Sequence, residues 1–316
     1  MNILIIGAGG VGIGLGASVK SQGANVSIFA RDKTAKSIKD NGIKRCGLFK
    51  HYEFSDIPVY EKYTDIPKNS IDYIFITSKT TANEDIAKNL NENREIFKQN
   101  TKIIIFQNGF GNDEFYLKYF LKEQVFCARV ITGFTRPERY ISEVTVYTEP
   151  ILLGSLQNIN PNQLQELADM ITNSGIKCEV TNELDKYLWA KMLYNCTLNG
   201  LGAILNVNYG LLTENPYTVQ IMDKIIEEIF DVIRASDYET LWQSNEEYKK
   251  LFYEKLVPDT YNHFSSTHQD IQKKHKTEID SLNGKVIELG RQYNIDVNTN
   301  KLIYNIIKGI ESTFWN

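Results

Sequence analysis

Short apolar runs alternate with amphipathic stretches through the first half of the chain. The apolar runs predict five strands, at Asn2–Ile6, Asn25–Ala30, Asp72–Ser78, Lys102–Phe106 and Val125–Val130. Helical spacing follows the first two runs, over Val11–Gln22 and Thr34–Asn41, and a polar stretch, Thr81–Lys98, separates the next two. Such an alternation of strands and helices predicts a parallel sheet with helices on both faces.

Two segments interrupt this alternation. Ile43–Tyr60 and Tyr140–Leu153 are rich in β-branched residues and in alternating apolar and polar positions. Alternation at every second residue is typical of strands with one buried face. We therefore expect both segments to be antiparallel additions at an edge of the sheet.

The pattern changes at Glu183, where strand signals give way to long helical stretches. Breaks between helices are expected near Gly202, Asn208–Gly210, Pro216, Pro258 and Gly284. The chain has 316 residues, a length that suits about two domains. The sequence thus predicts an α/β domain over residues 1–182 and an all-helical domain over residues 183–316.

Composition narrows the class of partner. The 35 basic and 39 acidic side chains give a net charge of −4, which supplies no general basic field for nucleic acid or for an anionic membrane. No run reaches the roughly 18 apolar residues that a membrane span needs. The four cysteines form no CxxC pair and have no zinc-like spacing to a histidine. We expect a cytoplasmic protein with no metal site.

A glycine-rich turn follows the first predicted strand. Gly7, Gly9 and Gly12 form G-x-G-x-x-G between that strand and the first predicted helix. In a dinucleotide-binding turn the first glycine allows a tight bend. The second lets the backbone approach a pyrophosphate, and the third lets the helix pack closely on the strand. Glycine turns are also common without any ligand. The strand before and the helix after this one favour a Rossmann-like domain that binds a dinucleotide.

The end of the second predicted strand bears on which dinucleotide is bound. Arg31 stands there, followed by Asp32. Arginine suits the 2′-phosphate of NADP, whereas an aspartate suits the ribose diol of NAD. Both residues could instead be solvated loop charges, but we favour Arg31 as a contact of NADP. Lys79, at the end of the third strand, is a second candidate for the phosphate or else a surface lysine.

A polar stripe runs along the most apolar helical stretch of the second half. Lys191, Asn195 and Asn199 are spaced by four residues, which rotates each about 40° from the previous one and places all three on one side of a helix. The surrounding positions are mostly apolar, which indicates a buried helix. The stripe is either a hydrogen-bonded structural network or a site lined with donors for an oxygen-rich ligand. A buried lysine favours the site.

A second polar segment lies between Ser265 and Gly284. Glu278 is either a functional carboxylate or an acid at a helix start, where Thr277 as N-cap and Asp280 form a capping box. Ser266 is either a ligand contact or, with Ser265, a helix cap.

Four segments together resemble the ketopantoate reductase family in their order and cover nearly the whole chain. They are GAGGVG at Gly7–Gly12, QNGFGN at Gln107–Asn112, WAKMLYNCTLN at Trp189–Asn199, and SSTHQD with TEIDSLNG within Ser265–Gly284. The glycine fingerprint is generic. The Trp-x-Lys helix combined with Thr-Glu-Ile-Asp is far more specific.

The resemblance implies roles for individual residues. Lys191 is expected to be the catalytic lysine and Glu278 its acidic partner. Substrate contacts are expected from Asn108, Asn195, Asn199 and Ser266. NADPH contacts are expected from Gly7, Gly9, Gly12, Arg31, Lys79 and Asn108.

The implied reaction is the NADPH-dependent reduction of 2-dehydropantoate, a small 2-keto acid, to pantoate in pantothenate and coenzyme A synthesis. Lysine at the carbonyl oxygen would stabilise developing negative charge and deliver a proton. Two alternatives remain open: a reductase of a different 2-keto acid, and a protein that senses NADP(H) without catalysis. The helical half is compatible with a homodimer.

Overall fold

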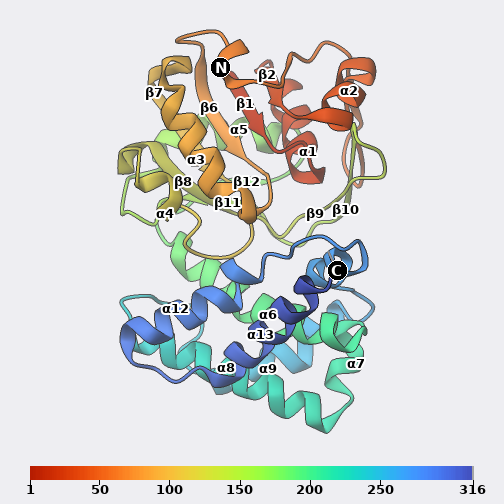
Figure 1. Ribbon diagram of the computed structural model, residues 1–316, viewed down its shortest axis with the longest axis vertical. Helices are drawn as coiled ribbons and strands as arrows, with labels where there is room; N and C mark the ends of the chain where they lie inside the picture. Colours follow the sequence, from red (N-terminus) through yellow and green to blue (C-terminus); the bar gives the residue numbers. More distant parts are fainter. Residues whose placement is uncertain (315–316) are drawn as a thin grey trace. The chain divides into compact units, whose positions relative to one another are not determined.

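The computed structural model describes residues 1–314, and their contacts divide the chain into two compact units (Figure 1). The first unit contains residues 1–107 and 112–184. The second contains the described residues from 185 onward together with the short segment Asn108–Gly111. The second unit is helical, and the α/β class predicted for the first half is confirmed along with it.

An eight-stranded sheet forms the centre of the first unit. Its strand order is β12-β11-β8-β7-β6-β1-β2-β5. The strands are β1 (Asn2–Ile6), β2 (Asn25–Phe29), β5 (Val59–Tyr60), β6 (Ile71–Ile76), β7 (Phe97–Ile105), β8 (Val125–Arg129), β11 (Ile151–Gly154) and β12 (Cys178–Val180). Every neighbouring pair is parallel except β8 and β11. The strand order reverses beside β1, where open α/β sheets bind their ligands.

Helices cover both faces of this sheet. They are α1 (Gly10–Lys20), α2 (Asp32–Asn41), α3 (Asn83–Glu92), α4 (Glu114–Leu117) and α5 (Gln165–Asn173). In Figure 1, α3 lies in front of the sheet and α5 behind it. The sheet residues between the two layers are almost completely buried, because parallel strands are covered on both sides.

The expectation that both segments add antiparallel strands at an edge of the main sheet was right only in part. From the second segment, β11 pairs antiparallel with β8, whereas β5, from the first segment, joins the opposite edge as a parallel strand. The rest of both segments lies outside the main sheet. A separate four-stranded sheet contains β3 (Ile43–Gly47), β4 (Tyr52–Phe54), β9 (Gly133–Thr135) and β10 (Ile141–Val146). Its central pair, β3 and β10, is parallel. Small residues on α1 explain the difference. A Cβ atom at Gly14 would lie 2.7 Å from the Phe134 ring, so the hairpin β9–β10 packs directly on α1.

The second unit is built around one long helix, α6 (Leu184–Leu205). The other helices are α7 (Tyr209–Thr213), α8 (Pro216–Ala235), α9 (Asn245–Leu251), α10 (Val257–Asp259), α11 (Ser266–Gln272), α12 (Asn283–Tyr293) and α13 (Asn298–Ser312). A five-residue π-helix, Phe252–Leu256, joins α9 to α10. None of the helices in the described part of the chain is long and apolar enough to cross a membrane.

The predicted helix breaks agree with the structure to within a few residues. Asn208 caps α7 and Pro216 begins α8. Near the other three predicted breaks, α6 ends at Leu205, α10 ends at Asp259 and α12 begins at Asn283. Gly202 itself lies inside α6. Glycines inside helices allow close packing here, because a Cβ atom on the neighbouring Gly200 would clash with Ile303 of α13.

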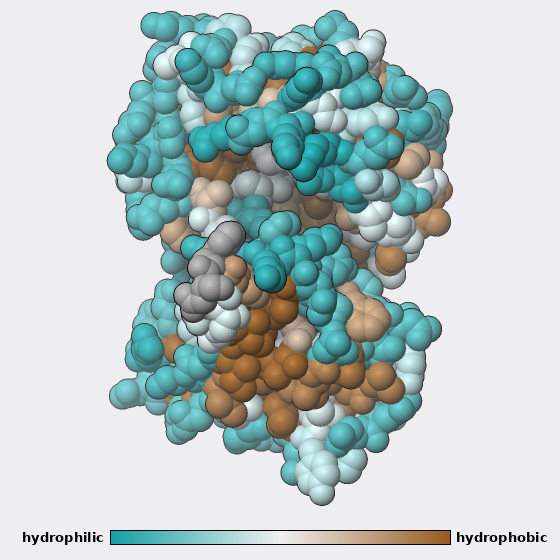
Figure 2. Space-filling view, turned by 45° about the vertical axis from the view of Figure 1, so that its right-hand side comes forward, coloured by the Kyte–Doolittle hydropathy of each residue, from teal (hydrophilic) through white to brown (hydrophobic). Residues whose placement is uncertain are grey.

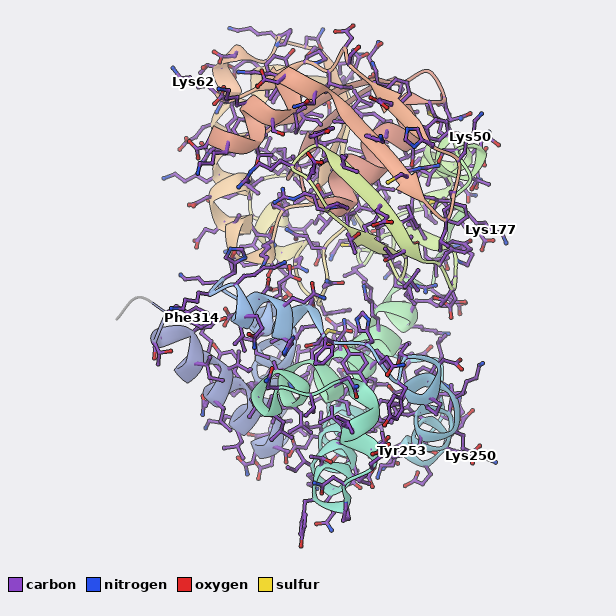
Figure 3. All side chains as sticks on the ribbon, turned by 90° about the vertical axis from the view of Figure 1, so that its right-hand side faces the viewer. Lys50, Lys62, Lys177, Lys250, Tyr253 and Phe314 are labelled. Atoms are coloured by element: carbon purple, nitrogen blue, oxygen red, sulfur yellow. The ribbon has the colours of Figure 1, made fainter. Side chains whose placement is uncertain are left out.

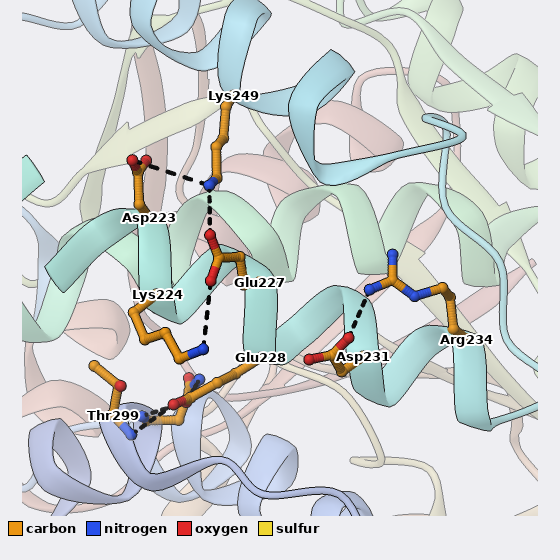
Figure 4. Close-up of polar contacts among 9 residues, drawn as sticks. Asp223, Lys224, Glu227, Glu228, Asp231, Arg234, Lys249 and Thr299 are labelled. Carbon is orange, nitrogen blue, oxygen red and sulfur yellow. Dashed lines mark hydrogen bonds and ion pairs between the residues drawn. The ribbon is translucent and has the colours of Figure 1, made fainter. Parts of the chain in front are cut away.

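A buried carboxylate fixes α13 on α8. Glu228 is 3% exposed and accepts hydrogen bonds from the backbone nitrogens of Thr299 (2.8 Å) and Asn300 (2.9 Å), which begin α13 (Figure 4). A buried carboxylate requires such donors, since an unpaired one is very costly. At the other end of α13, the Glu311 carboxylate accepts from the backbone nitrogen (2.7 Å) and hydroxyl (2.6 Å) of Thr277. Helix α13 therefore holds the segment that carries Glu278.

Candidate functional site

The glycine turn has the geometry that a dinucleotide requires. Gly7 adopts φ +113°, and a Cβ atom there would clash with the backbone of Ser78. A Cβ atom at Gly12 would clash with the Gly7 carbonyl oxygen, so α1 can pack this closely only with glycine. A Cβ atom at Gly9 would meet no atom within 4 Å. The three glycines thus provide the bend, the open approach and the close packing that distinguish a phosphate-binding turn.

The first turn of α1 is prepared for an anion. Gly9 is its N-cap residue, with an extended backbone and no side chain to accept from the helix N–H groups. No acidic residue lies in the first turn. The Thr77 hydroxyl donates to the Gly7 carbonyl oxygen at 2.6 Å and braces the turn from β6. Free N–H groups and the positive end of the helix dipole are what a pyrophosphate binds.

Arg31 and Lys79 end strands on either side of this turn. Strands β2 and β6 flank β1, so their carboxyl ends lie at the same edge of the sheet as the glycines. Arg31 is exposed at the N-cap of α2, with its guanidinium 5.7 Å from the Phe29 ring. Lys79 is also exposed. Asp32 is the first residue of α2 and adopts φ +50°, so it shares the helix end with Arg31.

A second polar group lies in the helical unit and joins three distant segments. The Lys191 ammonium donates to the Asn108 side-chain oxygen at 2.6 Å. The Asn108 amide nitrogen in turn donates to the Glu278 carboxylate at 3.2 Å. All three side chains are half-buried. We call this set the Lys–Asn–Glu bridge. Asn108 is the link between the lysine and the acid, a geometry that the sequence did not predict.

Lys191 lies on α6, the largely buried helix that the sequence predicted, although the lysine itself is half-buried and not fully buried. From Leu184 to Ile204 no residue of the helix is fully exposed. Trp189, two residues before Lys191, is completely buried against Phe110, with ring centroids 5.0 Å apart. The buried Trp189 fixes this part of the helix, and the Lys191 ammonium reaches the bridge.

The loop that carries Asn108 depends on a residue that sequence reasoning missed, Ser281. Gly109 adopts φ +94°, and a Cβ atom there would lie 2.5 Å from the Ser281 carbonyl oxygen. That same oxygen accepts from the Phe110 backbone nitrogen at 3.1 Å. The Ser281 hydroxyl donates to the Glu278 carbonyl oxygen at 3.0 Å. The Asn-Gly pair was the available signal, because it marks a turn with positive φ.

The residues flanking this loop belong to the first unit. Gln107 donates to Asn83 at 2.7 Å, and Asn83 donates to Asn112 at 3.2 Å. Asn83 is completely buried and also accepts from the Tyr116 hydroxyl. Sequence reasoning did not single out Asn83, since a polar residue at a helix start has no distinctive pattern. The motif QNGFGN is thus anchored at both ends by buried amides.

The structure divides the asparagine stripe of α6. Asn199 is 3% exposed, and its side-chain oxygen accepts from the Tyr209 hydroxyl at 2.7 Å, which fits a structural network. Asn195 is half-buried, and within residues 1–314 its side chain has no hydrogen-bonding partner. Eight residues of helix separate Asn199 from Lys191 by about 12 Å along the axis. The structure therefore does not place Asn199 in the bridge.

Neither Ser266 nor Glu278 has the helix-capping role that the sequence offered as the alternative to a functional role. Ser266 is exposed at the start of α11, and the capping side chain is that of Ser265, which accepts from the His268 backbone nitrogen at 2.9 Å. Glu278 precedes a short 3-10 turn rather than an α-helix. The capping box is absent, because Asp280 instead accepts from Tyr304 at 2.7 Å. Thr277 still accepts from the Ile279 backbone nitrogen at 3.3 Å, and residues of α13 add long-range partners for Thr277 and Asp280.

Near Asn199, the ring of His263 lies 5.2 Å from that of Tyr209. Burial lowers the pKa of His263, which favours the neutral imidazole. The imidazole of His263 is therefore less often protonated at neutral pH than an ordinary histidine.

Comparisons with known proteins agree along the whole chain. Residues 3–158 match the family described as "Ketopantoate reductase PanE/ApbA", and residues 183–311 match "Ketopantoate reductase PanE/ApbA C terminal". The chain is 35% identical over 314 residues to the 2-dehydropantoate 2-reductase of Aquifex aeolicus, covering 98% of this chain and 97% of that protein. It is 26% identical to the 2-dehydropantoate 2-reductase of Archaeoglobus fulgidus, covering 98% of each.

Solved structures share the fold. A ketopantoate reductase of the PanE/ApbA family from Ralstonia eutropha superposes with a TM-score of 0.87 at 21% identity, covering 100% of both chains. A D-mandelate dehydrogenase in a ternary structure with NADH and anilino(oxo)acetate has the same TM-score, identity and coverage.

Proposed function

The chain belongs to the ketopantoate reductase family, and from this membership we propose that it reduces 2-dehydropantoate to pantoate with NADPH. The reaction belongs to pantothenate and coenzyme A synthesis. The observation that carries the proposal is the Lys–Asn–Glu bridge, in a chain that also has a phosphate-binding glycine turn. A protein that only senses NADP(H) needs no proton donor, so that alternative is not favoured.

The glycine turn fits the cofactor. Gly7, Gly9 and Gly12 would hold the pyrophosphate at the start of α1, with Arg31 and Lys79 at the 2′-phosphate. NADPH, when bound, supplies the hydride that reduces the keto carbon. Asn108 is proposed to contact both the cofactor and the substrate.

The bridge supplies the proton. The Lys191 ammonium stabilises negative charge on the keto oxygen and then donates a proton from Nζ, which leaves a neutral amine that solvent reprotonates. Asn108 fixes the direction of that ammonium through the 2.6 Å hydrogen bond. Glu278, linked through Asn108, favours the charged lysine and can accept from a substrate hydroxyl. This division makes Lys191 and Glu278 the proposed catalytic residues.

The remaining substrate contacts are proposed from Asn195, Asn199 and Ser266. Asn195 has the strongest case, since its half-buried amide lies one turn beyond Lys191 and has no partner within residues 1–314. We keep residues 1–182 as the nucleotide-binding domain and 183–316 as the catalytic domain, with Asn108 contributed from the short segment within the first.

Two finer features remain proposals. A cytoplasmic location is supported by four free cysteines, as a reducing compartment would keep them. A homodimer is supported by exposed apolar side chains on the helical unit, among them Leu302 and Ile306, one turn apart on α13. Figure 2 shows apolar residues gathered on one face of this unit. Sedimentation at increasing concentration would test the dimer.

The function is tested by following NADPH oxidation with a panel of 2-keto acids. We expect the kcat/KM for 2-dehydropantoate to exceed that for pyruvate and 2-oxoisovalerate by about a hundredfold, because its additional hydroxyl offers a hydrogen bond to the site. Equal turnover of all three acids would contradict the assignment to pantoate synthesis. No turnover of any of them would contradict the reductase itself.

A further inference from the structure

Two arginines project from the turn that joins β9 to β10. The Arg136 guanidinium donates to the Ala8 carbonyl oxygen at 2.8 Å, inside the glycine turn. The Arg139 guanidinium donates to the Thr34 hydroxyl at 3.3 Å, in the first turn of α2. The same hairpin therefore contacts the chain at the start of α1 and at the start of α2, the helices that follow β1 and β2.

The fold holds this hairpin firmly in place. The Ser142 hydroxyl of β10 donates to the Gly10 carbonyl oxygen at 2.6 Å. A Cβ atom on Gly10 would lie 3.0 Å from the Phe134 carbonyl oxygen, so β9 lies directly against the first turn of α1. Contacts to both strands of the hairpin fix the position from which the two arginines extend.

The arginines at this end of the sheet, Arg31, Arg136 and Arg139, form no ion pairs with a carboxylate within the described residues. Burial and the neighbouring charge of Arg139 both lower the pKa of Arg136. Two like charges held close together beside a helix N-terminus form an environment that an anion stabilises.

We propose that the hairpin arginines contact the phosphates of NADPH, Arg139 at the 2′-phosphate and Arg136 at the pyrophosphate. The proposal rests on the NADPH dependence stated above. Arg31 and Thr34 share the first turn of α2, where the Thr34 backbone nitrogen donates to the Arg31 carbonyl oxygen at 3.1 Å. Arg139 reaches that turn from the second sheet, so two arginines from separate elements converge on it.

This arrangement explains how a chain with Asp32 in the same turn selects a phosphorylated ribose. The Asp32 carboxylate is exposed and repels a 2′-phosphate. Arg139 adds a second positive charge at the turn and offsets that repulsion. Arg139 is then a specificity residue for NADPH over NADH, whereas Arg136, at the glycine turn, contributes equally to both.

The test measures ligand binding by calorimetry and requires no keto acid. Arg139→Gln should weaken the binding of 2′,5′-ADP about tenfold and leave that of 5′-AMP unchanged, since one charge-assisted hydrogen bond is lost. Arg136→Gln should weaken NADPH and NADH by the same factor. Lys177→Gln is the matched control, because Lys177 is exposed immediately before β12, the strand at the opposite end of the sheet from β2 and β5. Figure 3 shows its side chain at the surface.

The outcomes separate this proposal from the reductase assignment. An equal effect of Arg139→Gln on 2′,5′-ADP and 5′-AMP, or no effect on either, would overturn the role of Arg139. An Arg136→Gln variant that loses NADPH binding alone would overturn the division between the two arginines. If the chain reduces none of the keto acids yet shows the expected binding pattern, the phosphate site stands and the reductase assignment fails.

Discussion

The glycine turn and the Lys–Asn–Glu bridge are two candidate sites that use different kinds of chemical group. The glycine turn offers backbone N–H groups, and it needs glycine because a Cβ atom at Gly7 or Gly12 would clash with the backbone. The Lys–Asn–Glu bridge offers three side chains from segments 83 and 170 residues apart in sequence. A site made of backbone groups can therefore be recognised from one short sequence motif. A site made of side chains from distant segments forms only when the helical unit folds.

This difference predicts which property a substitution in each site will impair. A substitution in the bridge should remove chemistry while leaving the fold and the cofactor affinity nearly intact. A substitution in the glycine turn should act on cofactor binding or on folding, depending on which glycine is changed.

The largest expected effect is that of Lys191→Ala. Loss of the proton donor should lower kcat about a thousandfold, with NADPH affinity within about threefold of the original. Lys186→Ala is the control on the same helix. Lys186 forms an ion pair with Glu239 at 2.9 Å, a contact of small energetic value. A Lys191→Ala variant with near-normal kcat would remove the lysine from the mechanism.

Asn108→Ala should have the next largest effect. Without the bridging amide, Lys191 and Glu278 each lose a hydrogen-bonding partner, and misplacement of a catalytic group costs about a hundredfold in kcat. Asn305→Ala, on the exposed side of α13, is the control. Steady-state kinetics separates the two proposed roles of Asn108. If only the KM for NADPH rises and kcat is unchanged, Asn108 is a cofactor contact and not part of the bridge.

Two variants of the glycine turn separate the loss of cofactor binding from the loss of stability. Gly9→Ala should weaken NADPH binding about tenfold with less than about 1 kcal/mol lost in stability, because the added methyl group meets no protein atom. Gly12→Ala should lower the free energy of unfolding by about 1–3 kcal/mol through the clash with the Gly7 carbonyl oxygen. Denaturant unfolding and calorimetry measure the two quantities. Equal stability losses would contradict the separate roles of these glycines.

The smallest expected effect concerns the surface of α8. The Lys249 hydrogen bond lowers the pKa of Glu227, opposed by a partial loss of hydration (Figure 4). A lowered pKa means that this stabilisation is complete above the ordinary carboxylate range and is lost as the pH falls through the folded-state pKa. Glu227→Gln should remove that acid-dependent loss, at most about 0.5 kcal/mol for a pair this exposed. Unfolding measured across acidic pH would show an unchanged slope if the pair contributes nothing.

Sequence reasoning predicted the glycine turn well because everything that defines it is local. The strand, the bend and the helix occupy the first twenty residues, and each glycine has its own backbone reason. The bridge was less accessible. Lys191 and Glu278 each had an alternative structural explanation, and only the resemblance to a family connected them. That Asn108 lies between them depends on the loop contact with Ser281, which no local pattern encodes.

The second sheet shows a different limit. Alternating residues in the two irregular segments correctly indicated strands with one buried face. The alternation did not say which surface would cover that face, and α1 covers it for the strands of the second sheet. The sequence did not single out Arg136 and Arg139, because their contacts with the glycine turn and with α2 depend on this packing.

The most direct test is a crystal structure of the protein with NADP⁺ and 2-dehydropantoate bound together. The account predicts the Lys191 ammonium within hydrogen-bonding distance of the keto oxygen, with Asn108 still joining it to Glu278. A keto oxygen held by other groups, with Lys191 bonded only within the protein, would contradict it.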